Sequence, residues 1–172
     1  MSDLSDLSIA IRRMREEDIP QAVEIEQLAF TRPWSKSIFK ATLLLPYAAY
    51  YVAAEGSADP AGLERVVGIC GVKKIFETGE ISNVAVHPDY RGRGISRRML
   101  EMLISEARAD GVEDFTLEVR AGNGIAVHLY ESFGFRTEGV RPGFYDKPVE
   151  DGLVMWLRKD EKDKKKEDID KT

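Results

Sequence analysis

The segment at 87–96, HPDYRGRGIS, combines residue types that suit the binding of an anion. It lies between an apolar stretch and a helical pattern that begins near Gly94. The first turn of a helix leaves backbone N–H groups without partners, and the helix dipole makes that end positive. Gly92 and Gly94 let the backbone approach a ligand closely, and Arg91 and Arg93 add permanent positive charge. An ordinary strand-to-helix turn with a solvated basic surface is the alternative, and on this segment alone both interpretations are open.

Several other kinds of site lack the residues they need. The chain has neither the Gly-Lys-Ser/Thr sequence of a Walker phosphate loop nor the glycine spacing of a dinucleotide-binding loop, which argues against ATP and NAD. Cys70 is the only cysteine, and His87 and His128 are the only histidines, so no intrachain disulfide can form and no metal site is expected. Cys70 lies in the apolar stretch VVGICGV, where a thiol is usually inert packing, and we do not expect a nucleophile with His128 as its base.

Composition indicates one globular domain. The 172 residues are 43% hydrophobic, which is enough for a single buried core. No apolar run reaches the ~20 residues that cross a bilayer, and the polar start MSDLSDLS is unlike a signal peptide, so we expect a cytoplasmic protein without membrane association. The net charge of −5 argues against a protein that binds nucleic acid over its whole surface, so we expect no DNA partner, although a local basic patch stays open. We predict a domain at 1–157 and a charged, disordered tail at 158–172, with a docking tail for ribosome or nucleic acid as the alternative.

Hydrophobic spacing predicts the elements of the first half of the chain. Alternation indicates a strand over 8–14, and helical spacing then indicates a helix over 15–30, which Pro33 ends. We expect one side of that helix to carry Ile19, Ala22, Val23, Ala29 and Phe30. Ser35 suits the N-cap of a second helix that runs to about residue 45. Strands over 47–55 and 66–76 are predicted to form a hairpin through GSADPAGLER.

Strands and helices alternate in the second half. We predict strands over 80–86, 114–119, 135–141 and 151–157, a helix from 94 to about 110, and another over 123–133. The first of these helices has apolar residues at every fourth position, namely Ile95, Met99, Leu103 and Ala107. In the strand over 114–119, Phe115, Leu117 and Val119 share one face and Thr116 and Glu118 the other.

The order of elements predicts the fold class. Runs of adjacent strands favour antiparallel pairing, while each strand–helix–strand unit from residue 80 onward requires a right-handed parallel crossover. We therefore expect an α/β (α+β) fold with one mixed, seven-stranded sheet and helices on both of its faces.

Taken with its neighbours, the segment at 87–96 resembles the GNAT acetyltransferase superfamily. The pyrophosphate loop of that family reads Gln/Arg-x-x-Gly-x-Gly/Ala, and here Arg91, Gly94 and Ser96 occupy the three patterned positions. Ser96 departs from the usual small apolar residue but keeps its backbone N–H. The stretches FTRPWS, LEVRAGN, LYESFGF and FYDKPVEDGLVM are similar to the RimI-type and archaeal protein N-terminal acetyltransferases, and the resemblance covers residues 9–157.

The resemblance implies acetyl-CoA as cosubstrate, held where the fourth and fifth strands of the sheet splay apart, and no metal. The family's cofactor contacts correspond to Val84, Ala85 and Val86 for the pantetheine arm and to Arg91, Gly92, Arg93, Gly94, Ile95 and Ser96 for the diphosphate. Asn123 matches a further contact to pantetheine, and by type and position it also suits the N-cap of its helix.

The resemblance also implies the catalytic groups. Acetyl transfer to an amine needs a neutral nitrogen, stabilisation of an oxyanion and a proton for the departing thiolate. Glu118 matches the general base, Glu80 is a second candidate base, and Tyr130 matches both the acid and a cofactor contact. A backbone N–H near Val86 would meet the oxyanion. Without the resemblance, Glu118 would be a solvated glutamate paired with Arg120, and Tyr130 a core aromatic with its hydroxyl at the rim.

The implied acyl acceptor is the N-terminal α-amine of a protein, attacked directly in a ternary complex. Phe30, Trp34 and Tyr145 lie in the segments that line the peptide in those families, and Trp34 as a core filler of the second helix is equally open. Phe144 stands where the pattern often has another tyrosine. Deprotonating a lysine at neutral pH costs about 3.5 kcal/mol more than deprotonating an α-amine, so a carboxylate base suits the α-amine.

Two alternatives stay open at this point. The first is an acetyltransferase that acts on lysine or on a small-molecule amine. The second is a regulatory module that binds acyl-CoA without turnover, although such a module has no need of both Glu118 and Tyr130.

Overall fold

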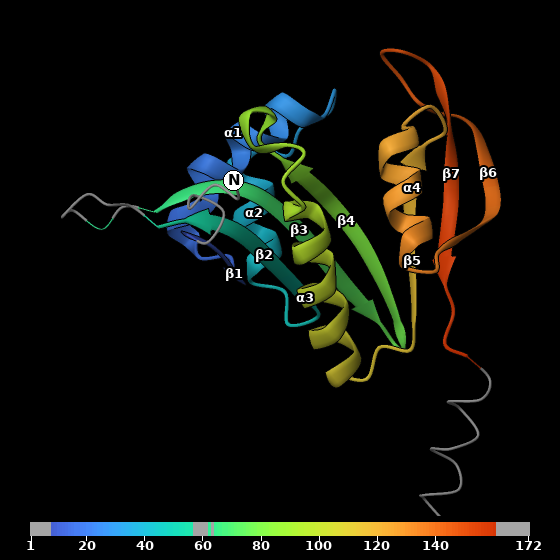
Figure 1. Ribbon diagram of the computed structural model, residues 1–172, viewed down its shortest axis with the longest axis horizontal. Coiled ribbons are helices and arrows are strands. Elements are labelled where there is room, and N and C mark those ends of the chain that lie inside the picture. Colours follow the sequence, from blue (N-terminus) through green and yellow to red (C-terminus); the bar gives the residue numbers. More distant parts are fainter. Residues whose placement is uncertain (1–7, 57–61, 63, 161–172) are drawn as a thin grey trace, which may run out of the picture. The chain divides into compact units, whose positions relative to one another are not determined.

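The computed structural model describes residues 8–56, 62 and 64–160. Its strands are β1 (Ile9–Arg13), β2 (Ala48–Glu55), β3 (Arg65–Ile75), β4 (Thr78–Val86), β5 (Asp114–Arg120), β6 (Arg136–Tyr145) and β7 (Glu150–Leu157). Its α-helices are α1 (Ile19–Ala29), α2 (Lys36–Leu43), α3 (Ile95–Ala109) and α4 (Gly124–Ser132), with 3-10 turns at Glu16–Asp18 and Pro88–Tyr90. The strands form one seven-stranded sheet in the order β1-β2-β3-β4-β5-β7-β6 (Figure 1).

The pairing directions confirm the predicted mixed sheet. The pairs β1–β2, β2–β3, β5–β7 and β6–β7 are antiparallel. β4 runs parallel to β5, from Thr78 beside Asp114 to Glu80 beside Thr116. The opening expected farther along these two strands stays a prediction.

The backbone divides into two compact units. The first comprises the residues up to Lys74 together with Ile81–Asp110, and the second comprises Ile75–Glu80 with the residues from Gly111 onward. Most of the predicted charged tail lies outside the described residues, as do parts of the loop between β2 and β3. Among the residues described, none of the helices has both the length and the apolar content needed to cross a lipid bilayer.

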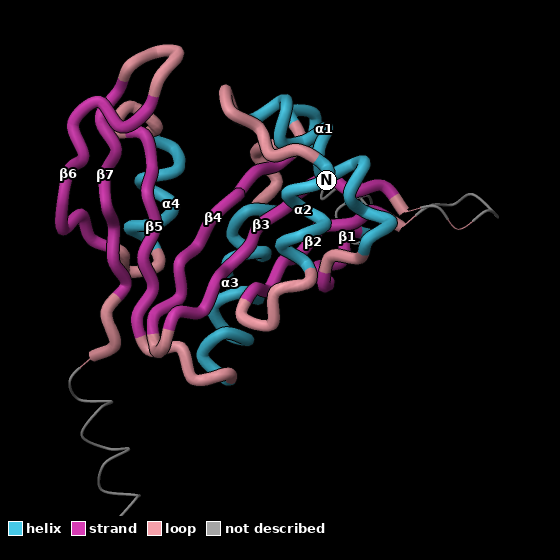
Figure 2. Tube along the Cα trace, turned by 180° about the vertical axis from the view of Figure 1, so that it is seen from behind, coloured by secondary structure: helices cyan, strands magenta, loops and turns pink. Residues whose placement is uncertain are grey.

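In the first unit, helices cover both faces of the β1–β3 sheet. Tyr50, Val52 and Ala54 of β2 belong to a buried cluster with apolar residues of α1 and α2. On the other face a Cβ at Gly68 would lie 3.0 Å from the Met99 side chain of α3, so that helix packs directly on the strand. Figures 1 and 2 show α3 on one side of β2 and β3 and the two N-terminal helices on the other. The predicted two-sided covering is therefore confirmed within this unit.

The predicted helix over 15–30 is shorter in the structure. Residues 16–18 form a 3-10 turn, and α1 spans Ile19–Ala29. Burial tends to raise the pKa of Asp18, but hydrogen bonds from the Arg12 side chain and the Arg15 backbone hold it below its ordinary value. Phe30 follows the helix in extended conformation and is 39% exposed, whereas the buried face includes Ile25 and Glu26. The expectation that Phe30 lies on the apolar side of the helix is wrong because the helix ends before it.

The second unit confirms the predicted faces of β5. Phe115, Leu117 and Val119 are buried, and Glu118, from the other face, is exposed. β6 extends beyond its predicted end at residue 141, since Tyr145 still pairs with Glu150 of β7 after an irregularity in the ladder.

The buried thiol of Cys70 should make the fold less stable at alkaline pH. The side chain is 0% exposed, and burial raises the pKa of the thiol. An unfolded thiol ionises near pH ~8.5, so the stability that comes from the protonated thiol is complete below that pH and is lost above it. We expect the free energy of unfolding to fall between pH 7.5 and 10.5 by about 2.7 kcal/mol more in the wild type than in Cys70→Ala. Urea denaturation of both proteins at the two pH values checks this, and an equal fall would contradict it.

Candidate active site

The candidate diphosphate segment has the predicted strand–loop–helix geometry. β4 ends at Val86, and α3 begins at Ile95 with Gly94 as its N-cap residue. Gly92 and Gly94 have φ angles of 76° and 73°, in the left-handed region where glycine is favoured. A Cβ built on either glycine meets no atom within 4 Å, so the backbone there is open. The N-terminal N–H groups of α3 and this open backbone fit an anionic group.

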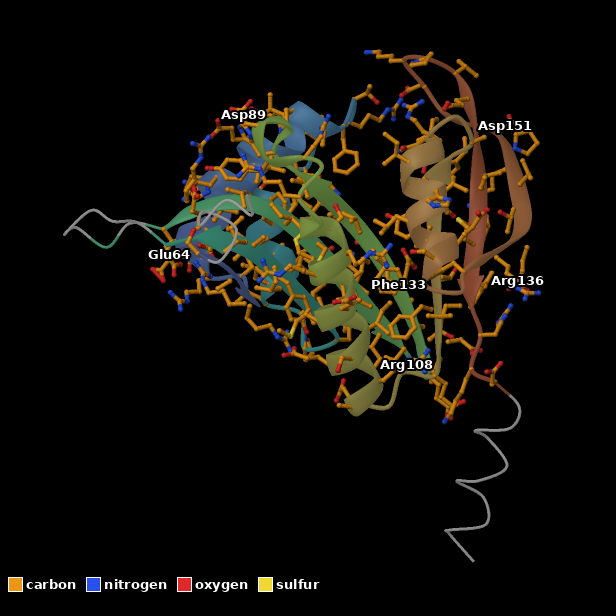
Figure 3. All side chains as sticks on the ribbon, viewed as in Figure 1. Glu64, Asp89, Arg108, Phe133, Arg136 and Asp151 are labelled. Atoms are coloured by element: carbon orange, nitrogen blue, oxygen red, sulfur yellow. The ribbon has the colours of Figure 1, made fainter. Side chains whose placement is uncertain are left out.

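The side chains of this segment are held by local contacts. Arg91 Nε donates a hydrogen bond to the Val86 carbonyl at 3.3 Å. The Arg93 guanidinium lies 4.9 Å from the centre of the Tyr90 ring, and it donates to the carbonyl of Asp89, which Figure 3 labels at the turn between β4 and α3. The two arginines thus bind to backbone carbonyl groups before and within the 3-10 turn, and they place positive charge around the loop. Their contact with a diphosphate stays a prediction.

The predicted pantetheine segment, Val84–Val86, forms the end of β4. Ala85 and Val86 are buried, and Val84 is half-buried. Asn83, which precedes the segment, has a φ of 58° and so interrupts the extended backbone within the strand. The direction of the segment is therefore set at Asn83.

In the second unit, Glu118 belongs to a cluster of polar and aromatic side chains from β5 and β6. Its Oε1 lies 3.1 Å from Arg141 Nε, and 30% of its side chain is exposed. Arg141 in turn lies 5.4 Å from the centre of the Phe144 ring, which packs edge-on against Tyr145 at 5.0 Å. We call Glu118, Arg141, Phe144 and Tyr145 the β5–β6 cluster.

The tyrosine of this cluster is a hydrogen-bond donor at neutral pH. Burial and the negative charges of Glu118 and Glu150 raise the pKa of Tyr145, although Arg120 opposes them. The Arg120 guanidinium lies 4.6 Å from the centre of the Tyr145 ring and donates to the carbonyl groups of Asp146 and Pro148. Arg120 thus holds the turn that follows Tyr145. Sequence reasoning missed Arg141, which pairs with Glu118.

The other carboxylate candidate, Glu80, lies on the same face of the sheet as Glu118. Glu80 is beside Thr116 in the parallel β4–β5 ladder, and side chains at paired positions of neighbouring strands point to the same face. Glu80 is exposed. Its place in the second unit is compatible with the predicted role of a second base, which stays a prediction.

The helix α4 positions the two remaining candidates of the second unit. The Asn123 side chain accepts a hydrogen bond from the Ala126 N–H at 3.2 Å, so the predicted N-cap is confirmed. Tyr130 is 7% exposed, and its ring centre lies 5.8 Å from that of Phe135. The ring of Tyr130 is therefore part of the core, as both interpretations of this residue require.

Figure 3 labels Asp151 at the start of β7 and Arg136 at the start of β6, which are opposite ends of this antiparallel pair. Asp151 Oδ1 accepts a hydrogen bond from the Gly143 N–H at 2.9 Å. This bond holds the bent end of β6, which carries the aromatic residues of the β5–β6 cluster.

The peptide-contact candidates of the first unit lie between α1 and α2. Trp34 lies directly before Ser35, the N-cap residue of α2. Its half-buried ring lies 5.3 Å from Phe39 and 5.7 Å from Tyr50, and Lys73 Nζ lies 5.4 Å from the ring centre. Trp34 therefore packs against the core of its unit, while Phe30 is partly exposed.

Sequence reasoning missed a buried polar network in the first unit. Glu26 is 1% exposed, and its Oε1 accepts hydrogen bonds from the Trp34 N–H at 3.2 Å and from Asn83 Nδ2 at 2.9 Å. The Tyr50 hydroxyl donates to Asn83 Oδ1 at 3.1 Å and lies 3.0 Å from Ser82 Oγ. Two signals were available: Glu26 falls at helical spacing among apolar residues, and Asn83 interrupts an apolar strand.

The described part of the chain contains no cluster of metal-ligand side chains. Within residues 8–56, 62 and 64–160, no group of three or more His, Cys, Asp or Glu side chains is placed to hold a metal ion.

Comparison with known proteins gives consistent results. Residues 19–135 match the model of the acetyltransferase (GNAT) family. The chain is 34% identical over 149 residues to the [ribosomal protein bS18]-alanine N-acetyltransferase of Escherichia coli K12, covering 86% of this chain and 95% of that protein. It is 31% identical over 150 residues to the enzyme of the same name from Haemophilus ducreyi, covering 86% and 98%.

Solved structures agree with these relatives. The crystal structure of the ribosomal-protein-S18-alanine N-acetyltransferase from Escherichia coli matches with a TM-score of 0.75 and 30% identity, over 87% of this chain and 93% of that one. Ard1 from Thermoplasma volcanium matches with a TM-score of 0.76 over 90% and 99%, and at 24% identity this likeness concerns the fold.

Proposed function

Since the chain belongs to the GNAT acetyltransferase family and is an acetyl-CoA-dependent N-acetyltransferase, we propose that its acceptor is the N-terminal α-amine of a protein. The first candidate is a ribosomal protein that begins with alanine. The observation that carries this choice is the 34% identity to the Escherichia coli alanine N-acetyltransferase, which extends over 95% of that enzyme. A ribosomal substrate also agrees with the expected cytoplasmic location.

The residues of the first unit fit the cosubstrate. Gly92 and Gly94 leave the backbone at the start of α3 open, and N–H groups there suit a diphosphate. Arg91 and Arg93 supply positive charge around it. The peptide-like amides of pantetheine suit pairing with the backbone of Val84–Val86. Asn123, from the second unit, is the further proposed contact to pantetheine.

The proposed catalytic roles assign the tasks of amide formation to the residues that the family resemblance implies. Glu118 takes a proton from the α-ammonium group, so that the neutral nitrogen can attack the acetyl carbon. A backbone N–H near Val86 stabilises the negative charge on the acetyl oxygen. As the carbon–sulfur bond breaks, Tyr130 gives a proton to the departing sulfur, and Glu80 is the reserve base. One nitrogen–carbon bond forms and one carbon–sulfur bond breaks. The nitrogen loses its second proton as the tetrahedral intermediate collapses, and this proton restores the Tyr130 phenol. The proton on Glu118 is released to solvent, so one proton leaves for each acetyl group transferred.

The β5–β6 cluster supports a substrate with a free ammonium group. The Glu118 carboxylate is partly exposed, and its negative charge helps to raise the pKa of Tyr145, whose phenol is neutral at physiological pH. A carboxylate and an aromatic face together favour a cation. Phe30 and Trp34 are the proposed contacts to the first residues of the peptide from the α1–α2 segment.

Acetylation of a matched set of peptides tests the acceptor. Each peptide begins with alanine and contains one lysine, and the set includes versions with the α-amine blocked, the lysine blocked, or both blocked. After incubation with acetyl-CoA, fragment-ion mass spectrometry locates the acetyl group. We expect it only on the α-amine, and blocking the lysine should leave the rate unchanged.

The same assay distinguishes the remaining candidates. Acetyl found on lysine in the peptide with a blocked α-amine, and absent from free α-amines, would overturn the proposed acceptor. The doubly blocked peptide is the control for chemical acetylation by the thioester itself. Replacing the first residue by leucine or aspartate then measures how far the preference for alanine extends.

A further inference from the structure

Glu26 is a buried carboxylate whose hydrogen bonds, within the described residues, come from neutral groups. It lies on the inner face of α1 and is 1% exposed, among the apolar residues of the first unit's core. Burying a charge in such surroundings is costly unless it is paired or well hydrogen-bonded. Within the described residues the recorded partners of this carboxylate are neutral donors. Burial raises the pKa of Glu26, and those two hydrogen bonds oppose the rise.

The hydrogen bonds of Glu26 connect the α1–α2 segment, which carries the proposed peptide contacts, to β4, which carries the proposed pantetheine contacts. Oε1 accepts from the backbone N–H of Trp34, at the entrance to α2, and from the side chain of Asn83 in β4. Oε2 has no hydrogen-bond partner among the described residues. A single carboxylate oxygen thus links the α1–α2 segment to β4. This linkage gives the buried carboxylate a structural role.

Asn83 is strained in a way that needs such support. Its φ of 58° puts it in the left-handed region, which costs a residue with a Cβ about 1 kcal/mol or more and which Asn tolerates better than most. The Asn83 side chain is held at both ends, since Nδ2 donates to Glu26 and Oδ1 accepts from the Tyr50 hydroxyl.

Tyr50 is buried and closely packed against β3. Its ring lies so close to β3 that a Cβ at Gly71 would fall 2.3 Å from it, and its side chain is 2% exposed. The Asn83 side chain is therefore bound to two fixed partners. The left-handed turn comes directly before Val84–Val86, so the fixed side chain determines how that backbone leaves the turn.

We propose that Glu26 is a positioning residue for acetyl-CoA binding: by holding the Asn83 side chain it keeps the left-handed turn in β4 and so aims the backbone of Val84–Val86. This inference rests on the proposed function, which assigns the pantetheine arm to that segment. The carboxylate acts through Asn83 and does not itself touch the substrate.

Two substitutions of Asn83 separate backbone positioning from simple loss of a side chain. Asn83→Ala and Asn83→Gly both remove the bonds to Glu26 and Tyr50. Glycine adopts positive φ without steric cost, whereas alanine does not. By calorimetric titration with CoA, we expect Asn83→Ala to raise the dissociation constant about tenfold and Asn83→Gly to raise it several-fold less. Equal dissociation constants for the two variants would overturn the proposal.

Glu26→Gln tests the carboxylate with its shape preserved. Hydrogen bonds to a charged acceptor are roughly twice as strong as neutral ones, so we expect a rise of about fivefold in the CoA dissociation constant. Glu24→Gln, on the exposed side of the same helix, is the matched control and should bind CoA like the wild type. In an Asn83→Gly background, Glu26→Gln should cause no further loss, because the residue through which it acts is gone.

The outcomes separate this inference from the proposed function. If every folded variant binds CoA like the wild type, the positioning role of Glu26 is wrong. The proposed peptide acetylation would still stand. If the wild type binds CoA but acetylates no α-amine, the proposed acceptor is wrong, and the pattern of dissociation constants still decides the role of Glu26. The unfolding temperature of each variant is measured first, and the titrations are run below the lowest of them. If Glu26→Gln does not fold, the comparison of Asn83→Ala with Asn83→Gly by itself decides whether the turn positions the backbone.

Discussion

Replacing Glu118 by glutamine should lower kcat for an alanine-starting peptide by about 10²–10⁴-fold, the range that a general base contributes. Glutamine keeps the size and the hydrogen-bonding oxygen of the side chain but cannot accept the proton of the α-ammonium group. The effect should be confined to turnover. The proposed CoA contacts come from other segments, so the dissociation constant of CoA should stay within about twofold of the wild-type value.

The ion pair between Glu118 and Arg141 does not prevent this role. The Arg141 side chain is 58% exposed, and exposed ion pairs typically contribute only about 0–1 kcal/mol, so a substrate ammonium group can displace the guanidinium. Glu138→Gln is the control, because Glu138 also pairs with an arginine, Arg158, on the surface of the same unit. Steady-state rates at saturating acetyl-CoA measure both variants. Wild-type turnover in Glu118→Gln would show that Glu118 is a solvated glutamate on the strand face and not the general base.

Tyr130→Phe should lower kcat by about 10²-fold, again with CoA affinity nearly kept. The ring packs in the core beside Phe135, and phenylalanine preserves that packing, so the fold should be unchanged. Only the hydroxyl that would protonate the departing sulfur is removed. Initial acetylation rates measure the effect, and unfolding temperatures of the two proteins verify that the core is intact.

Tyr47→Phe serves as the control for Tyr130→Phe, since Tyr47 is 49% exposed and has no proposed part in the reaction. Unchanged turnover in Tyr130→Phe would identify the residue as a core aromatic with its hydroxyl at the rim. If neither Glu118→Gln nor Tyr130→Phe reduced turnover, the assignment of the chemical groups would be refuted as a whole.

Features with a local cause could be predicted from the sequence. The apolar spacing of Ile95, Met99 and Leu103 alone defines the buried face of α3, and the structure buries all three. Ser35 and Asn123 cap their helices as predicted, because an N-cap depends on the residue type and on N–H groups only a few positions away. The positive φ of Gly94 follows likewise from the local need of a strand-to-helix turn.

Features that depend on distant partners could not be predicted in this way. Glu26 and Asn83 are 57 positions apart in the chain, and only the fold brings the carboxylate to the amide. The pairing of Glu118 with Arg141 depends on the order of the strands, in which β7 lies between β5 and β6.

The position of a bound product and acceptor tests the central claim most directly. A crystal structure of the protein with CoA and an alanine-starting peptide should place the diphosphate within hydrogen-bond distance of backbone N–H groups in 92–96. The carboxylate nearest to the peptide nitrogen should be that of Glu118. A diphosphate bound elsewhere, or a peptide nitrogen whose nearest carboxylate belongs to another residue, would contradict the account.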